Sequence, residues 1–254
     1  MDTLLSGYTY TSIFRYLACV GDSLSSGEFQ LPKAEDSTRY NYYDKYEYSW
    51  GQFLARKAGI TVYNFSRGGM TAREYLTGFA EGAGFFKPEY KAQAYILALG
   101  VNDLLNRHEE PGELADIDTG NEENNRPTFL GLYAKILQKY RKINPDAKFF
   151  LVTMPRDCDD TEEKDTYKKI HRELLFGLAG LFPGTYVLDL YRDGPVHDRE
   201  YKKNFYLYGH LNPMGYIRTA SQIDALIHGI VAAHPEEFAL AGMDELIPTG
   251  FLQV

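Results

Sequence analysis

The stretch Tyr16-Leu17-Ala18-Cys19-Val20-Gly21-Asp22-Ser23-Leu24 joins an apolar run to a short polar sequence. The run is typical of a buried β-strand, and Ser23 follows soon after its end. In an α/β sheet the carboxyl ends of the strands open into the crevice where ligands bind. Ser23 is therefore a candidate nucleophile, although an Asp-Ser pair is also common in turns and at helix caps.

Further short apolar runs follow, separated by longer amphipathic segments. This alternation predicts a parallel sheet with helices on both faces. We expect strands at Arg15–Val20, Ile60–Phe65, Ala94–Leu99, Ala147–Thr153 and Thr185–Leu190. We expect helices at about Tyr48–Ala58, Thr71–Phe79, Arg126–Ile143, Thr161–Leu181 and Pro213–Ala233. Residues 1–254 are expected to form a single domain, with a core at about 15–235 and a C-terminal extension at 236–254.

The composition narrows the functional classes. With 254 residues, 44% hydrophobic and 24% charged, the chain is an ordinary globular protein. Its net charge of −8 argues against nucleic acid as a partner. The longest apolar runs fall far short of the roughly 20 residues that a membrane span needs. Two cysteines do not suggest a disulfide framework or a zinc site, and residues 1–10 show no secretory signal, so we expect a cytoplasmic protein.

Tyrosine is unusually frequent, with 21 residues, and five of the nine residues from Tyr40 to Tyr48 are tyrosines. Most of this segment belongs to a long excursion at 28–47 that follows the first predicted strand, and a second excursion at 104–125 follows the third. Both leave from strand carboxyl ends, where long loops tend to be functional. Tyrosine combines a flat apolar face with a hydroxyl, which suits sugars. The alternative is a loop that packs on its own domain.

Three more polar sequences lie at the ends of predicted strands or before the last helix. They are Asn64-Phe65-Ser66-Arg67-Gly68-Gly69-Met70-Thr71, Gly100-Val101-Asn102-Asp103 and Gly209-His210-Leu211-Asn212-Pro213. Acyl transfer by a serine needs a base for its proton and hydrogen-bond donors for the developing oxyanion. Together with Ser23, these sequences supply a serine, a glycine amide, an asparagine amide and a histidine at one edge of the sheet.

These four sequences, in this order, resemble the blocks of the SGNH hydrolases, also called the GDSL esterase/lipase family. The resemblance spans about 15–235. It implies a flavodoxin-like three-layer α/β/α sandwich with a five-stranded parallel sheet of order 2-1-3-4-5. It also implies that Ser23 attacks the ester carbonyl and His210 acts as general base. The backbone N–H groups of Ser23 and Gly69 and the side-chain amide of Asn102 would form the oxyanion hole.

One position departs from the family pattern. The family carries an Asp three residues before its histidine, to orient the imidazole, and this chain has Leu207 there. A backbone carbonyl or a water could orient His210 instead. A carboxylate could also come from elsewhere, with Asp193 and Asp198 the nearest candidates and Asp189 behind them. The third alternative is an inactive site.

Two other features compete with this interpretation. The sequence Asp157-Cys158-Asp159-Asp160-Thr161 matches the spelling of haloacid-dehalogenase-type phosphatases, but three residues separate it from the predicted strand. We interpret it as the acidic start of a helix. His197 is a second candidate base, in a polar loop that contains a proline.

The sequence therefore predicts a serine esterase that needs no metal or cofactor and acts through an acyl-enzyme. The expected partner is a small-molecule ester with a small acyl group, with acylated carbohydrates as the favoured class. A lipase or thioesterase is the alternative enzyme. Because of Leu207, a non-catalytic ligand-binding relative is the alternative outside the enzymes.

Overall fold

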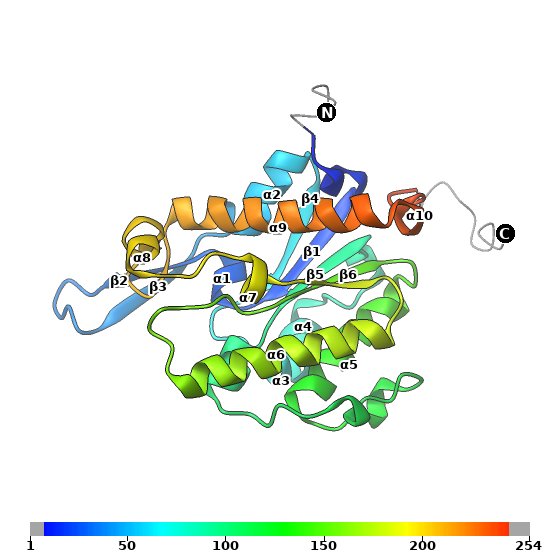
Figure 1. The fold of residues 1–254 in the computed structure, drawn as a ribbon, viewed down its shortest axis with the longest axis horizontal. Helices are drawn as coiled ribbons and strands as arrows, with labels where there is room; N and C mark the ends of the chain where they lie inside the picture. The colour runs from blue at the N-terminus through cyan, green and yellow to red at the C-terminus, as the bar shows by residue number, and fades with distance from the viewer. Residues whose placement is uncertain (1–7, 244–254) are drawn as a thin grey trace.

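The computed structural model describes residues 8–243 and has three layers, with a parallel sheet between two layers of helices (Figure 1). The sheet has the order β4-β1-β5-β6-β7. Its strands are β1 (Tyr16–Gly21), β4 (Thr61–Ser66), β5 (Ala94–Ala98), β6 (Lys148–Val152) and β7 (Thr185–Leu188). The predicted order 2-1-3-4-5 is confirmed, and the bounds differ from the predicted ones by one or two residues.

Helices cover both faces of the sheet (Figure 1). One face carries α2 (Trp50–Ala58) and α9 (Pro213–Ala233), and the other carries α5 (Phe129–Ile143) and α6 (Glu162–Leu181). The helix predicted at 71–79 is instead broken into α3 (Ala72–Glu74), a π-helical turn at Tyr75–Phe79 and α4 (Ala80–Ala83), because Gly78 has non-helical dihedral angles. The shorter helices are α1 (Ser23–Ser26), α7 (Leu190–Asp193), α8 (Arg199–Phe205) and α10 (Pro235–Phe238).

The core forms two apolar clusters, one on each face of the sheet. Successive residues of β1 alternate between them, so that Ala18 and Val20 pack toward α5 while Leu17 and Cys19 pack toward α2 and α9. Strands buried on both faces are apolar at every position, which explains the continuous run at 16–20. This burial holds the carboxyl ends of the strands, and the loops that follow them, in place.

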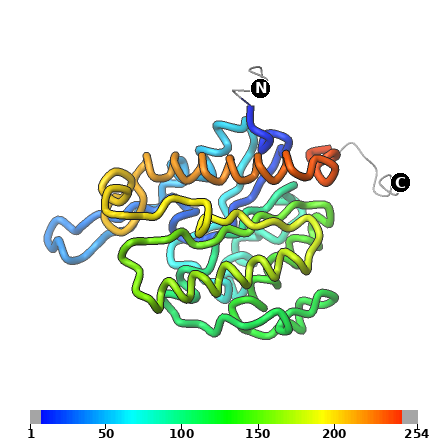
Figure 2. The backbone as a smooth tube through the Cα atoms, viewed as in Figure 1, coloured from blue at the N-terminus to red at the C-terminus, as the bar shows by residue number. Residues whose placement is uncertain are grey.

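Two small antiparallel hairpins lie outside the main sheet. The first pairs β2 (Glu28–Pro32) with β3 (Tyr40–Asp44), and the second pairs β8 (Tyr206–Leu207) with β9 (His210–Leu211). In Figures 1 and 2 the β2–β3 hairpin extends from the body of the molecule beyond the carboxyl edge of the sheet. Strand β2 packs against both β8 and β9. The sequence indicated only a long excursion here, because polar and charged residues occupy most of the hairpin.

The C-terminal extension is only partly covered by the described residues. Phe238 of α10 is buried and packs edge-on against Phe14, with ring centroids 6.3 Å apart. Residues 244–254 lie outside the described residues, so the predicted division into a core and an extension stays a prediction. Within residues 8–243, no helix combines the length and the apolar character that crossing a membrane requires.

Candidate active site

The candidate nucleophile stands in a tight turn between β1 and α1. The carboxylate of Asp22 caps α1 by accepting a hydrogen bond from the Leu24 backbone N–H at 3.1 Å. A side chain at Gly21 would bring its Cβ to 2.3 Å from Ser25 Oγ, so only glycine allows the turn to close this tightly. Ser23 is partly exposed, whereas the two serines that follow it are buried. Ser23 is thus the serine of this turn that a substrate can reach.

Two backbone N–H groups lie free beside this turn. Gly69 is exposed and has φ +70°, a left-handed conformation that favours glycine. A Cβ on Gly69 would meet no atom within 4 Å. Glycine is therefore favoured at this position by its φ angle and not by a lack of space. Among residues 8–243, neither the Ser23 N–H nor the Gly69 N–H donates a hydrogen bond. Both are available to an oxyanion.

The side chain of Asn102 brings a third loop to the same place. Its Nδ2 lies 3.4 Å from Asp22 Oδ2 and 3.2 Å from the backbone oxygen of Met70. Its Oδ1 accepts a hydrogen bond from Asn106 Nδ2 at 2.9 Å, which fixes which end of the amide faces the serine turn. Both Nδ2 contacts are long for hydrogen bonds, so the amide can turn toward a stronger acceptor.

Two buried carboxyl groups hold these loops together. Burial raises the pKa of Asp22 to about 6, against the opposing effects of the Leu24 N–H and of His210. Burial likewise raises the pKa of Asp103 to about 7. Asp103 Oδ1 accepts a hydrogen bond from the Ala72 N–H at 2.7 Å, and its Oδ2 has no partner within the described residues. Asp103 therefore ties the loop of Asn102 to the start of α3, next to Gly69.

The imidazole of His210 is held at both nitrogens by strand β2. Nδ1 lies 3.1 Å from Gln30 Oε1, and Nε2 lies 3.1 Å from Glu28 Oε1. Glu28 and Gln30 are two residues apart on one strand, so their side chains share a face. Leu207, at the position of the missing acid, is the cross-strand neighbour of His210 in the β8–β9 hairpin.

The carboxylates considered for orienting His210 have other partners. Asp193 binds Arg192 at 2.8 Å, and Asp198 caps α8 by accepting from the Tyr201 N–H at 2.7 Å. Asp189 pairs with Arg172 at 2.7 Å. Within the described residues, none of these three carboxylates contacts His210. The groups that hold His210 were missed in the sequence because they lie about 180 positions earlier in the chain.

Ser23, Gly69, Asn102 and His210 all line one open cleft of about 770 Å³. The wall around them also carries Glu28, Tyr42 and Tyr208. No hydrogen bond joins Ser23 Oγ to His210 in the part of the chain that the structure describes. The structure thus brings the four predicted site residues to a single cleft, with the imidazole directed toward Glu28.

His197, the second candidate base, also lines this cleft, but it is packed into its wall. It is 8% exposed, stacks on Tyr201 with ring centroids 4.2 Å apart, and places Nδ1 2.9 Å from the Tyr206 hydroxyl. Burial lowers its pKa to about 4. A neutral imidazole with such a low pKa is a poor acceptor for a serine proton near neutral pH.

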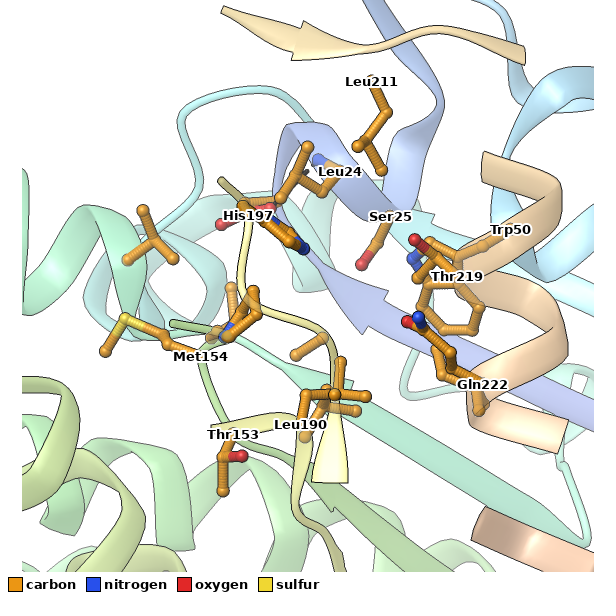
Figure 3. A pocket seen from close by; sticks show the side chains of 18 residues that line it. Leu24, Ser25, Trp50, Thr153, Met154, Leu190, His197, Leu211, Thr219 and Gln222 are labelled. Carbon is orange, nitrogen blue, oxygen red and sulfur yellow. Dashed lines mark hydrogen bonds between the residues drawn. The ribbon is translucent and has the colours of Figure 1, made fainter. Parts of the chain in front are cut away.

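A second, smaller cavity of about 80 Å³ lies next to the cleft (Figure 3). It is lined mostly by apolar side chains, among them Trp50, Leu190 and Leu211, while the polar ends of Ser25 and Gln222 point into it. Several residues line both spaces, namely Asp22, Leu24, Val101, Met154, Pro155 and His197. A small apolar space therefore adjoins the open cleft.

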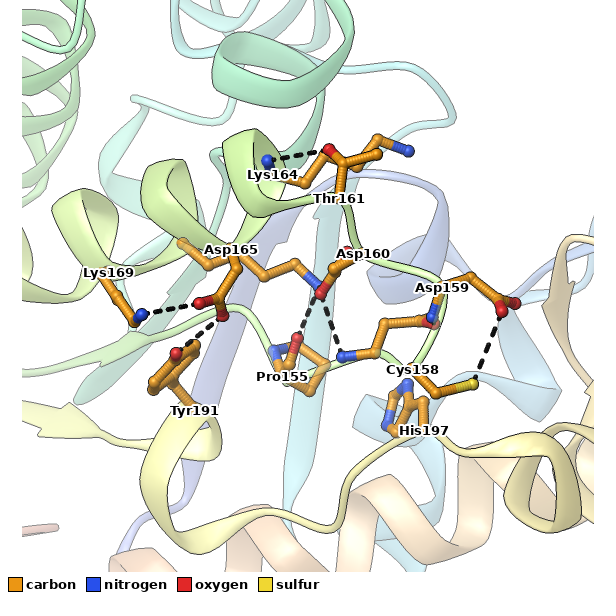
Figure 4. A network of polar contacts seen from close by, with 12 residues as sticks. Pro155, Cys158, Asp159, Asp160, Thr161, Lys164, Asp165, Lys169, Tyr191 and His197 are labelled. Atoms are coloured by element: carbon orange, nitrogen blue, oxygen red, sulfur yellow. Dashed lines mark hydrogen bonds and ion pairs between the residues drawn. The ribbon is translucent and has the colours of Figure 1, made fainter.

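From the acidic sequence at 157–161, Asp157 and Asp160 line the cleft. Figure 4 shows the polar contacts of this segment. Asp160 pairs with Lys168, which also donates to the backbone oxygen of Pro155 at 2.8 Å. Lys202 lies 2.6 Å from Asp157 and 2.7 Å from Asp159. Thr161 caps α6, as the interpretation of an acidic helix start predicts. The acidic side chains are thus paired with lysines.

Comparisons with known proteins place this chain in a family. Residues 19–218 match the GDSL-like lipase/acylhydrolase family. A comparison with curated proteins finds no match.

Among solved structures, a family two carbohydrate esterase from Clostridium thermocellum is 12% identical with a TM-score of 0.59, covering 86% of this chain and 64% of that chain. An acetyl xylan esterase from Butyrivibrio proteoclasticus is 18% identical with a TM-score of 0.55, covering 86% and 64%. A family 3 carbohydrate esterase from Clostridium thermocellum is 16% identical with a TM-score of 0.54, covering 89% and 98%. This chain thus spans just under two thirds of the first two.

At these identities the solved structures show a shared fold, and the family match carries the assignment. Its span includes all four site residues and the loops that carry them. The chain belongs to the GDSL-like lipase/acylhydrolase family and is a hydrolase of ester bonds.

Proposed function

We propose that the chain hydrolyses esters through an acyl-enzyme, with Ser23 as nucleophile and His210 as general base. The observation that carries this proposal is the convergence of Ser23, Gly69, Asn102 and His210 on one cleft. They come from four loops that lie far apart in the sequence. A serine, a base and a set of free donors within one cleft are the parts that acyl transfer needs.

The reaction follows from these positions. Ser23 Oγ attacks the acyl carbonyl while His210 takes the hydroxyl proton. The oxyanion accepts hydrogen bonds from the N–H groups of Ser23 and Gly69 and from Asn102 Nδ2. When the intermediate collapses, the C–O bond breaks and His210 returns the proton to the leaving alcohol. A water, activated by His210, then adds to the acyl group, and the acid leaves as Ser23 regains its proton.

One contact must change before this reaction begins. The Nε2 edge of His210 faces Glu28 at 3.1 Å, with side chains that are 15% and 12% exposed. A nitrogen that donates to a carboxylate carries a proton and cannot accept one from serine. The Nε2 proton must therefore pass to water in the open cleft, and Nε2 must exchange Glu28 for Ser23 Oγ, when a substrate enters. Hydrogen bonds of this kind are often incomplete before substrate binds.

For the substrate, we propose a small acyl group, such as acetyl, on a carbohydrate. Tyr42 and Tyr208 line the cleft and are 55% and 54% exposed, so their rings are free to contact a sugar face. Tyr208 has φ +59°, an uncommon conformation for a non-glycine residue that often marks functional sites. The adjoining cavity of about 80 Å³ leaves little room for a long acyl chain.

Hydrolysis of 4-nitrophenyl esters of increasing chain length tests the proposal. We expect the highest kcat/KM with acetate and a decline toward octanoate. A preference for chains beyond about eight carbons would instead support the lipase or thioesterase alternative.

A fluorophosphonate probe tests the nucleophile. We expect one adduct, on Ser23, which the Ser23→Ala variant loses and the matched Ser25→Ala variant keeps. A wild-type protein that neither reacts with the probe nor hydrolyses any ester of the series would support the non-catalytic alternative.

Variants of the rim tyrosines test the carbohydrate part. We expect Tyr208→Ala to lower the ratio of kcat/KM for an acetylated oligosaccharide to kcat/KM for 4-nitrophenyl acetate by about 10-fold, which is the loss of roughly 1.4 kcal/mol of sugar contact. Tyr43 is a matched control, because it is 44% exposed and does not line the cleft. Equal ratios in the wild type and in Tyr208→Ala would contradict the assignment of a sugar.

A further inference from the structure

The imidazole of a general base needs an acceptor at the nitrogen that faces away from the reaction. That acceptor selects the tautomer and holds the plane of the ring. Leu207 has no polar atom to offer. In the structure, Gln30 Oε1 lies 3.1 Å from His210 Nδ1 and can serve as this acceptor. We propose that Gln30 is the positioning residue of His210 and replaces the missing acid. This inference rests on the proposed function of His210 as the base.

The surrounding backbone is shaped to admit the Gln30 amide. A Cβ on Gly209, the residue before His210, would lie 2.2 Å from Gln30 Oε1. Only a glycine at 209 leaves room for the amide to reach the imidazole from this side. Glycine is needed at position 209 for space and not for its backbone conformation, because Gly209 does not have a positive φ.

Strand β2 is itself held firmly against the body of the protein. Gln30 pairs with Tyr42 in the β2–β3 ladder. The hydroxyl of Tyr216, a fully buried residue of α9, donates to the backbone oxygen of Glu28 at 2.7 Å. Phe29 points to the opposite face and packs edge-on against Tyr216 and Tyr48, with centroids 5.7 and 5.8 Å apart. The amide of Gln30 is thus presented to His210 from an anchored strand.

The chemistry of an amide differs from that of a carboxylate in one respect. Gln30 Oε1 accepts from Nδ1–H and thereby leaves Nε2 as the reacting nitrogen, as an aspartate would. It carries no charge, however, so it stabilises the imidazolium of the transition state only through a neutral hydrogen bond. A carboxylate at position 30 would keep the geometry and add a charge. Gln30 therefore positions His210 without adding a charge. The Gln30→Glu variant should keep this position and change the pH dependence of the activity.

Three variants at position 30 separate the loss of the hydrogen bond, a change in its reach and the addition of a charge. For each, kcat/KM for 4-nitrophenyl acetate is measured from pH 5 to 9. We expect Gln30→Leu to lower kcat by about 10- to 100-fold with little change in KM. This loss is smaller than the roughly 10⁴-fold cost of disturbing a carboxylate-held imidazole. Gln30→Asn keeps the amide but shortens its reach, and we expect a similar loss. Gln30→Glu should stay within about 10-fold of the wild type and move the acid limb of the pH profile upward by about one pH unit.

Gln52→Leu is the matched control, because Gln52 is also partly buried and its amide binds a backbone oxygen of β4, at 3.2 Å, and not His210. We expect its activity and pH profile to equal those of the wild type. Circular dichroism and the thermal midpoint check that each variant is folded. Wild-type activity in a folded Gln30→Leu variant, or a pH profile that Gln30→Glu leaves unmoved, would overturn the proposal.

A second readout does not depend on turnover. A proton on Nδ1 that is held by Gln30 should give a protected imidazole N–H resonance in the NMR spectrum of the wild type and of Gln52→Leu. We expect Gln30→Leu to lose this resonance, and its persistence there would overturn the positioning role. If the wild type shows no Ser23-dependent hydrolysis, the proposed function fails. Even in that case, loss of the resonance in Gln30→Leu would support Gln30 as the partner of His210.

Discussion

The two walls of the cleft are built in different ways. The serine wall comprises Asp22, Ser23, Gly69 and Asn102, which follow three neighbouring strands of the buried sheet. The histidine wall comprises Glu28, Tyr42 and His210, which belong to two small hairpins outside that sheet, and Gln30 supports His210 from behind it. Backbone geometry next to buried strands shapes the serine wall. Contacts between side chains distant in the sequence shape the histidine wall.

This difference suggests how each wall responds to substitution. The serine wall contains the nucleophile and the donors for the oxyanion, so a change there removes a group that contacts the reacting atoms. The histidine wall contains the base and the groups that orient it, so most changes there alter an orientation or a local charge. We therefore expect the largest losses on the serine wall and smaller, pH-dependent effects on the histidine wall.

The largest effect is expected for Ser23→Ala, which removes the attacking oxygen. We expect kcat for 4-nitrophenyl acetate to fall by at least about 10⁴-fold, since loss of a serine nucleophile in other enzymes costs up to about 10⁶-fold. Steady-state kinetics after purification free of other esterases measure this loss. Substantial activity in the variant would show that the serine wall does not hold the nucleophile.

Asn102→Ala removes one donor and leaves the nucleophile and base in place. We expect a fall in kcat of about 10²- to 10³-fold, the usual cost of losing one oxyanion donor. Asn204→Ala is the control, because Asn204 is exposed on α8 and lies outside the cleft. If the two variants have equal kinetics, Asn102 is not a donor of the oxyanion hole.

Asp103→Asn tests the interior of the serine wall through stability. Burial raises the pKa of Asp103 to about 7, from 3.8. The folded protein thus holds a proton that the unfolded chain releases, so this stabilising contribution is complete below about pH 4 and is lost as the pH rises through 7. Asparagine keeps the acceptor for the Ala72 N–H and cannot ionise. Relative to the wild type, we expect the variant to gain about 2 kcal/mol in free energy of unfolding between pH 5.5 and 8.

Urea unfolding at the two pH values measures that difference. A constant difference in the free energy of unfolding across this range would mean that Asp103 is ionised in the folded protein throughout.

Gly209→Ala tests the histidine wall without touching a polar group. The added methyl group would lie 2.2 Å from Gln30 Oε1 and must displace the amide. We expect a loss of about 10-fold in kcat, equivalent to roughly 1.4 kcal/mol in the activation free energy. Gly180→Ala serves as the control, because a Cβ there meets no atom within 4 Å. If Gly209→Ala keeps wild-type kcat, the packing of Gln30 against position 209 has no role in orienting His210.

The smallest effect is expected for Glu28→Gln. In the wild type, the contact with Glu28 keeps Nε2 turned away from Ser23, and glutamine keeps a polar side chain of the same length at that position. We expect kcat/KM for 4-nitrophenyl acetate to change by only about 2- to 5-fold. A loss larger than about 10-fold would show that Glu28 assists the base instead of competing with Ser23 for Nε2.

The serine wall could be predicted from the sequence because its determinants are local. The apolar run at 16–20 indicated a buried strand, and the polar residues directly after it could only lie at the edge of the sheet. The same argument applied to Gly69 and Asn102. The break at Gly78 was not predicted, because a single glycine is tolerated within many helices.

The histidine wall could be predicted only in part. His210 was found through its motif before α9, but its partners were sought among the nearest aspartates. Those aspartates cap helices or pair with arginines, which are contacts that acidic residues make in any fold. The signal for Gln30 was weak, because a glutamine in a polar hairpin is usually solvated.

By itself, the sequence determined the positions of the strands, the covering helices and the chain positions of the reactive groups, while the order of the strands followed from the family resemblance. These depend on apolar periodicity and on short motifs, which neighbouring residues specify through burial and backbone geometry. Only the tertiary structure decided what holds the imidazole. Gln30 meets His210 because β2 packs on the β8–β9 hairpin and glycine at 209 leaves a gap of the right size. Such a contact depends on the folding of segments about 180 residues apart, and no local pattern encodes it.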